Sequence, residues 1–122
     1  MSKSNNQKVW PSEKNPIVEV QWQLLSGFNE EGDPVYKSGK VTEADQLTVL
    51  SKEMATLQPN ETLFTTVAMG RLDLILKDNQ KLRIQPVFSQ KTNLYQDLFY
   101  ADHNQYNMPS EMKRLLNRWR IE

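Results

Sequence analysis

The fold is organised around residues 71–85, which read Arg71-Leu-Asp-Leu-Ile-Leu-Lys-Asp-Asn-Gln-Lys-Leu-Arg-Ile-Gln85. Apolar residues alternate with polar or charged ones on both sides of Asp78-Asn79, and this period of two is typical of half-buried β-strands. The stretch therefore predicts a β-hairpin with one apolar face, formed by Leu72, Leu74, Leu76, Leu82 and Ile84.

The register of this hairpin depends on the length of its loop. A two-residue turn would place leucines opposite lysine and arginine and would mix the two faces. A three-residue loop, residues 78–80, would pair Leu76 with Leu82 and Leu74 with Ile84, so that one face is wholly apolar. We expect the three-residue loop, and we expect amphipathic helices to cover the apolar face.

Composition limits the possible functions of the 122-residue chain. Its length fits one domain with a single core. Lys+Arg and Asp+Glu are balanced at 15 each, so no overall field favours nucleic acid or an anionic membrane. The chain has no cysteine, which excludes disulfides, thiolate nucleophiles and cysteine-ligated metals. These numbers are those of an ordinary globular domain.

The N-terminal residues differ from the rest in composition. Residues 1–15 are polar and lysine-bearing and predict a flexible leader, with Trp10 as an exposed tail residue, before a single domain at 16–122. They contain no apolar signal-peptide core, and no run of the chain is long and apolar enough for a membrane span. We therefore expect a cytoplasmic protein without a membrane span.

The remaining elements follow from periodicity and from breaker residues. Apolar stripes at three- and four-residue spacing predict helices over 42–57, capped by Thr42, and over 110–120, started by Pro109. Pro86 must lie at a strand end, an edge or a bulge, because it has no amide proton. We expect a first strand at 17–25, with Val18, Val20, Trp22 and Leu24 on one face. A short return strand should follow at 35–37, and after the hairpin we expect a loop at 88–93 and a strand at 95–100.

The order of these elements predicts the fold class. Strands joined by short turns, with one helix after the second strand and one at the end, are typical of an α+β domain. We expect an antiparallel sheet centred on the hairpin at about 71–85. The helices at about 42–57 and 110–120 would cover it.

No catalytic motif is visible in the sequence. His103 is the only histidine, and it lies between Asp102 and Asn104 in an expected turn, where polar residues are common for structural reasons. No serine lies in a nucleophile elbow, and the four glycines are scattered, so neither a phosphate loop nor a dinucleotide fingerprint is present. We predict no catalytic residue, no metal site and no cofactor.

The sequence favours a non-catalytic protein-binding or accessory module, acting on another protein or on itself as a homodimer. Two alternatives stay open. The first is a nucleic-acid-binding domain that uses the basic last helix and sheet aromatics, although the zero net charge makes nucleic acid an unlikely partner. The second is a small-ligand or enzymatic domain around His103. The candidate interaction residues are Lys113, Arg114, Arg118, Arg120, Tyr100 and Tyr106.

Overall fold

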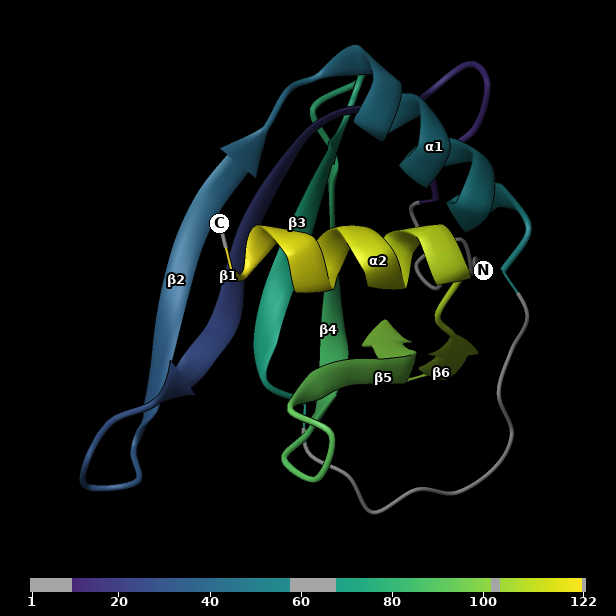
Figure 1. Ribbon diagram of the computed structural model, residues 1–122. Helices are drawn as coiled ribbons and strands as arrows, with labels where there is room; N and C mark the ends of the chain where they lie inside the picture. The colour runs from purple at the N-terminus through teal and green to yellow at the C-terminus, as the bar shows by residue number, and fades with distance from the viewer. Residues whose placement is uncertain (1–9, 58–67, 102–103, 122) are drawn as a thin grey trace, which may run out of the picture.

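The computed structural model describes residues 10–57, 68–101 and 104–121. These residues form an antiparallel sheet and two helices, which confirms the predicted α+β class (Figure 1). The elements, in chain order, are β1 (Ile17–Phe28), β2 (Pro34–Val41), α1 (Ala44–Ala55), β3 (Gly70–Leu76), β4 (Lys81–Ser89), β5 (Leu94–Ala101), β6 (Asn104–Asn107) and α2 (Ser110–Trp119).

The strands lie in the order β2-β1-β3-β4-β5-β6, and every neighbouring pair is antiparallel. β4 belongs to two parts of the sheet, because its first half pairs with β3 and its second half with β5. The register shifts between Pro86 and Phe88, so Pro86 lies at a bulge, as predicted. Residues 88 and 89 continue β4, so the loop expected to begin at Phe88 is shorter than predicted.

The central hairpin is confirmed, but its predicted register is wrong by two residues. Leu74 pairs with Leu82 and Leu72 with Ile84, so the three-residue loop is 77–79 rather than 78–80. A shift of two keeps every side chain on the same face, so apolar patterning could not separate the two registers. The observed loop puts Asn79 at a φ of 71°, a left-handed conformation that asparagine tolerates.

The first strand is longer than predicted, and its beginning faces differently. Val18 was expected in the core but is exposed, and Ile17 is buried in its place. The pairing of β1 with β3 shifts between Ile17 and Glu19, and this bulge turns Val18 outward. The return strand β2 spans eight residues rather than the three expected.

The helices lie close to their predicted positions and cover the apolar face of the sheet (Figure 1). α1 begins at Ala44 with Glu43 as its N-cap residue and has no side-chain cap, so the cap predicted at Thr42 is wrong. The apolar stripe of α2 is buried as predicted, and it consists of Met112, Leu115, Leu116 and Trp119.

The segment before β1 contacts the domain. Trp10 is half-buried and packs edge-on against Tyr106 at 5.3 Å, so the prediction of an exposed tail residue is wrong. Asn15 accepts a hydrogen bond from the backbone N–H of Asp78 at 3.1 Å, which ties this segment to the β3–β4 loop. Residues 1–9 of the predicted leader lie outside the described residues.

Candidate functional site

The six residues predicted as an interaction surface are not brought together on one surface. Tyr106 is buried and stacks on Phe99. Arg120 is only 4% exposed, and its Nε donates to the carbonyl of Leu25 at 2.6 Å. Tyr100 is half-buried on β5, where it pairs in register with Gln85 and Gln105. Arg120 and Tyr106 therefore belong to the packing of the domain.

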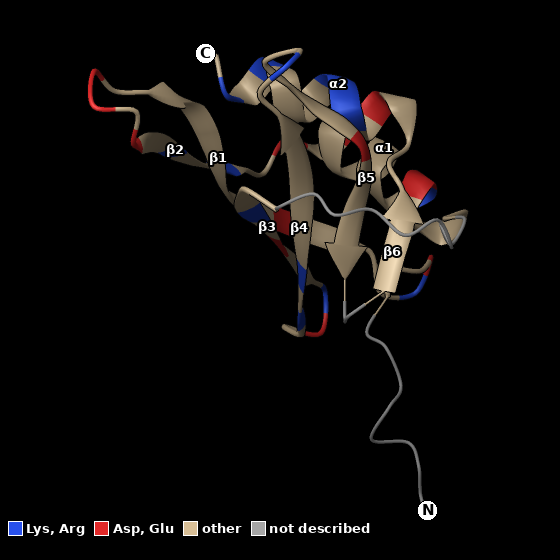
Figure 2. Ribbon diagram, turned by 90° about the horizontal axis from the view of Figure 1, so that it is seen from below, with Lys and Arg blue, Asp and Glu red and all other residues tan. Residues whose placement is uncertain are grey.

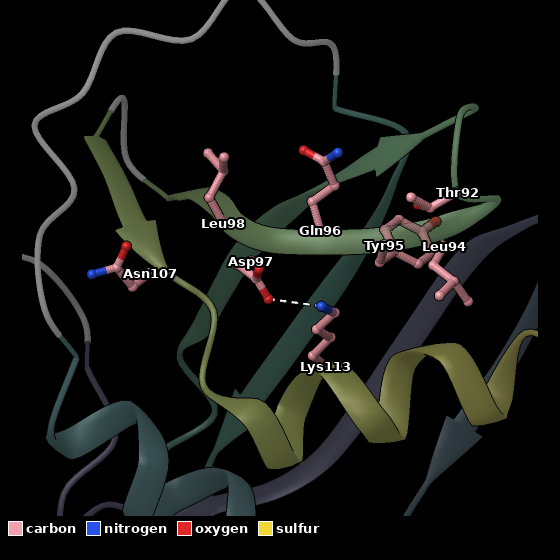
Figure 3. A pocket seen from close by; sticks show the side chains of 8 residues that line it. All are labelled: Thr92, Leu94, Tyr95, Gln96, Asp97, Leu98, Asn107 and Lys113. Atoms are coloured by element: carbon pink, nitrogen blue, oxygen red, sulfur yellow. Dashed lines mark hydrogen bonds and ion pairs between the residues drawn. The ribbon is translucent and has the colours of Figure 1, made fainter.

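Two cations of α2, the exposed Arg114 and the half-buried Lys113, are paired within the chain. Arg114 binds Glu111 at 2.6 Å. Lys113 binds Asp97 at 2.8 Å across a cleft of about 380 Å³ between β5 and α2 (Figure 3). The Asp97 side chain is 81% exposed, so this pair is solvated and weak. Internal pairing lowers the positive charge that α2 offers to phosphates, which weakens the case for nucleic-acid binding.

The second alternative depended on His103, which lies outside the described residues. Within residues 10–57, 68–101 and 104–121, no group of three or more acidic, histidine or cysteine side chains is placed to hold a metal ion. No helix in the same ranges is both long and apolar enough to cross a bilayer.

The strongest candidate site is the edge of the sheet formed by β2. β2 and β6 are the two outermost strands of the sheet, and among the described residues only β1 pairs with β2. The β1–β2 hairpin extends away from the helices, and its tip carries acidic residues (Figure 2). An edge strand presents unpaired N–H and C=O groups that can pair with another chain. Near the tip, Phe28, Val35 and Tyr36 are exposed, with Tyr36 at 39%.

A cleft of about 440 Å³ lies beside β2 on the side covered by the helices. Its apolar lining residues are Val41, Trp22 and Trp119, and the two indole rings stack at 6.2 Å with an interplanar angle of 11°. Trp119 Nε1 donates to Gln46 Oε1 at 3.1 Å, which fixes the ring against α1. A Cβ at Gly39 would lie 2.3 Å from the Trp22 ring, so the ring lies across β2 only because residue 39 is glycine.

A second cleft, of about 330 Å³, lies beside β2 on the opposite, uncovered face. The two clefts share Trp22, Ser38 and Lys40. On this face Lys40 is paired in register with Gln21, and Gln21 with Asp73 of β3. The edge strand therefore has one cleft on each of its faces.

The uncovered face contains a buried carboxylate that is held by arginines. Asp73 is 4% exposed and accepts two hydrogen bonds from Arg83, at 2.8 and 3.2 Å. Arg71 lies 3.5 Å from the same carboxylate. Burial opposes ionisation of Asp73, but the hydrogen bond and charge of Arg83, with Lys81 and Arg71, outweigh it and hold the pKa of Asp73 below its usual value.

A larger open groove lies elsewhere, between α1 and residues 12–18. It has a volume of about 710 Å³ and is lined mostly by apolar atoms, with Val18 at its exposed side. A groove of this kind suits apolar side chains of a partner. Unlike the β2 edge, it offers no row of backbone groups and little net charge, since one acid and one lysine line it.

Few sequence features indicate the β2 edge. The segment Ser38-Gly39-Lys40 lacks alternation, so β2 was expected to end at residue 37. Gly39 opposite Trp22 is the signal that could have revealed it, because glycine inside a strand often marks a close approach. In comparisons with known proteins, no family model, no curated protein and no solved structure matches this chain.

Proposed function

We propose that this protein is a non-catalytic binding module that takes up an extended segment of another protein at the edge of β2. The observation that carries the proposal is an open edge strand with a cleft on each of its faces. In strand addition, backbone hydrogen bonds supply affinity, and pockets for alternate side chains supply specificity.

The geometry of an added strand supports this proposal. Successive side chains of a strand point to opposite faces of the sheet. A segment paired with β2 would direct one side chain towards the cleft of Trp22 and Trp119 and the next towards the cleft of Lys40. Flat indole rings offer a large apolar surface at low entropic cost.

A selection experiment with matched variants tests the proposal. Peptides selected from a displayed library for binding to the full chain should shift the NMR signals of β2 amides and of the Trp22 indole. Gly39→Ala should weaken this binding by about tenfold or more, because the new Cβ displaces the Trp22 ring from its place over β2.

Gly27→Ala is the matched control, since a Cβ at residue 27 meets no atom within 4 Å. It should leave the binding unchanged. Selected peptides that instead perturb the α1 groove around Val18, or that bind Gly39→Ala as well as the wild type, would contradict the assignment of the binding site to the β2 edge.

A further inference from the structure

We infer that the segment taken up by β2 is acidic on the side that faces the uncovered cleft; this inference rests on the proposed function. The observation that supports this inference is the positive charge around that cleft. Lys40 lies on the edge strand itself, and Arg71 lies two strands further in, with its side chain 45% exposed.

The carboxylates of this face do not cancel its positive charge. Asp73 is bound by Arg83 through two hydrogen bonds, which leaves Arg71 as a second, more distant cation. Arg71 also donates to Gln23 Oε1 at 2.5 Å, so its guanidinium is held on the sheet surface. The described cations of the face are Lys40, Arg71, Lys81 and Arg83, and its acids are Glu19 and Asp73.

Lys40 is the cation nearest to an added strand. It is exposed, and no hydrogen bond or ion pair of its side chain is found among the described residues. A carboxylate on the neighbouring strand would lie beside it on the same face, where opposite charges attract across strands. An acidic segment therefore gains an interaction at Lys40 that a neutral segment lacks.

The same charges argue against a second copy of this chain as the occupant. Two β2 edges paired with each other would bring Lys37 and Lys40 of both copies into one interface. Lysines on an edge strand oppose such pairing. The acidic residues near β2 lie in the hairpin tip, at Glu30, Glu31 and Asp33, outside the eight-residue strand.

The opposite cleft selects a different kind of side chain. There the half-buried Trp22 ring, stacked on the buried Trp119, is the apolar surface beside β2, so an apolar or aromatic side chain fits against it on the helix side. The inferred partner is thus an extended segment in which acidic residues alternate with apolar or aromatic ones, a pattern that matches the two faces of β2.

Three synthetic peptides of the length of β2 test the inference on the full chain. All carry valine or phenylalanine at alternate positions, and the intervening positions are glutamate, glutamine or lysine. We expect the glutamate peptide to bind about tenfold more tightly than the glutamine peptide and the lysine peptide to bind least, with shifts at the β2 amides in NMR titrations. The preference should weaken as ionic strength rises.

A charge reversal assigns the preference to Lys40. Lys40→Glu should invert the order of the glutamate and lysine peptides, whereas Lys91→Glu, an exposed reversal in the β4–β5 turn, should leave the order unchanged. Equal binding of all three peptides at β2 would overturn the acidic partner but keep the proposed function. If none of the three peptides, and no library peptide, shifts the β2 amides, the proposed function itself fails. Concentration-dependent dimerisation that shifts these amides would assign the edge to a second copy and overturn the inference.

Discussion

Tyr95 shows at the scale of one residue how the two parts of the sheet are joined. Its hydroxyl donates to the carbonyl of Met69 at 2.7 Å and accepts from the backbone N–H of Leu25 at 2.8 Å. The side chain is buried, so these backbone groups depend on the hydroxyl for a partner. One phenolic oxygen thus connects β5 to β1 and to the start of β3.

We predict that Tyr95→Phe lowers the free energy of unfolding by roughly 1–3 kcal/mol, because a buried donor loses its partner. Burial raises the pKa of Tyr95 to about 12. A tyrosine of the unfolded chain ionises near a pKa of about 10, so this stability is present below pH ~10 and is lost as the pH rises towards the folded value. The difference in the free energy of unfolding between the wild type and Tyr95→Phe should therefore decrease above pH ~10.

Denaturant unfolding measured at neutral and alkaline pH checks both parts of this prediction. Tyr36→Phe is the control, because Tyr36 is an exposed tyrosine of β2. It should change stability by less than about 0.5 kcal/mol. A Tyr95→Phe variant as stable as Tyr36→Phe at neutral pH would mean that water replaces the hydroxyl.

At the scale of elements, α1 supplies the cap that α2 lacks. Pro109 makes no side-chain cap, but Glu53 Oε1 accepts a hydrogen bond from the N–H of Met112 at 2.8 Å. A carboxylate at the start of a helix also interacts well with its dipole. The contact between the helices is therefore partly a capping contact.

The pH dependence of Glu53 provides a test of this cap. Burial raises the pKa of Glu53, and the N–H groups of Met112 and Glu111 offset this only in part. Between the unfolded pKa of about 4.3 and the raised folded pKa, unfolding releases a proton. The contribution of this carboxyl to the free energy of unfolding therefore falls as the pH rises through this window. As the pH rises through this window, the free energy of unfolding of Glu53→Gln should increase relative to that of the wild type. Glu53→Ala removes the cap and should lower the free energy of unfolding by about 1 kcal/mol.

Trp119 joins α2 to the sheet and to α1. It stacks on Trp22 and donates to Gln46, three residues before the last residue of the chain. Trp119→Ala should lower the free energy of unfolding by roughly 3–5 kcal/mol, as truncations of buried aromatics do. Arg118→Ala, an exposed change on the same helix, should have an effect below about 0.5 kcal/mol. Equal, small effects in thermal unfolding would show that the helix end is not needed for stability.

The elements that could be predicted are those with strong periodicity. The stripe of α2 and the alternation of β3 and β4 follow from burial of one face, so position and type were right. The predicted hairpin register was wrong because a shift of two residues leaves the pattern of apolar and polar faces unchanged. The predicted end of β2 was wrong because Ser38-Gly39-Lys40 contains no large apolar residue that would extend the alternation. The β2 edge is a property of strand order, which periodicity does not encode.

At the scale of the whole molecule, Arg120 is the residue whose predicted position differs most from the observed one. It was predicted on an interaction surface and is buried. A cation at the C-terminal end of an amphipathic helix, such as Arg120 directly after α2, normally faces solvent. Here the apolar stripe ends at Trp119, and the chain turns the next side chain inward. The Arg120 guanidinium lies 4.9 Å from the centre of the Phe88 ring. The periodicity of the sequence cannot predict this contact, because the contact depends on where strands distant in the chain end.

Arg120 connects the end of the chain to two distant segments. Its Nε donates to the carbonyl of Leu25 in β1, and its Nη1 donates to the carbonyl of Asn93 in the β4–β5 turn at 3.2 Å. We predict that Arg120→Met, which keeps the apolar stem but removes the donors, lowers the free energy of unfolding by roughly 1–3 kcal/mol. Arg120→Lys should not restore it, because one ammonium cannot reproduce the forked geometry of the guanidinium.

The matched control for this last prediction is Arg114→Met, which removes the same charge from an exposed position of α2. Urea unfolding followed by tryptophan fluorescence and by far-ultraviolet circular dichroism measures both stability and cooperativity. The two signals should change together in every variant, with only the Arg120 variants shifted to lower urea. If Arg120→Met unfolds at the same urea concentration as Arg114→Met, the carbonyls of Leu25 and Asn93 find other donors. The end of the chain would then contribute little to holding β1 against the β4–β5 turn.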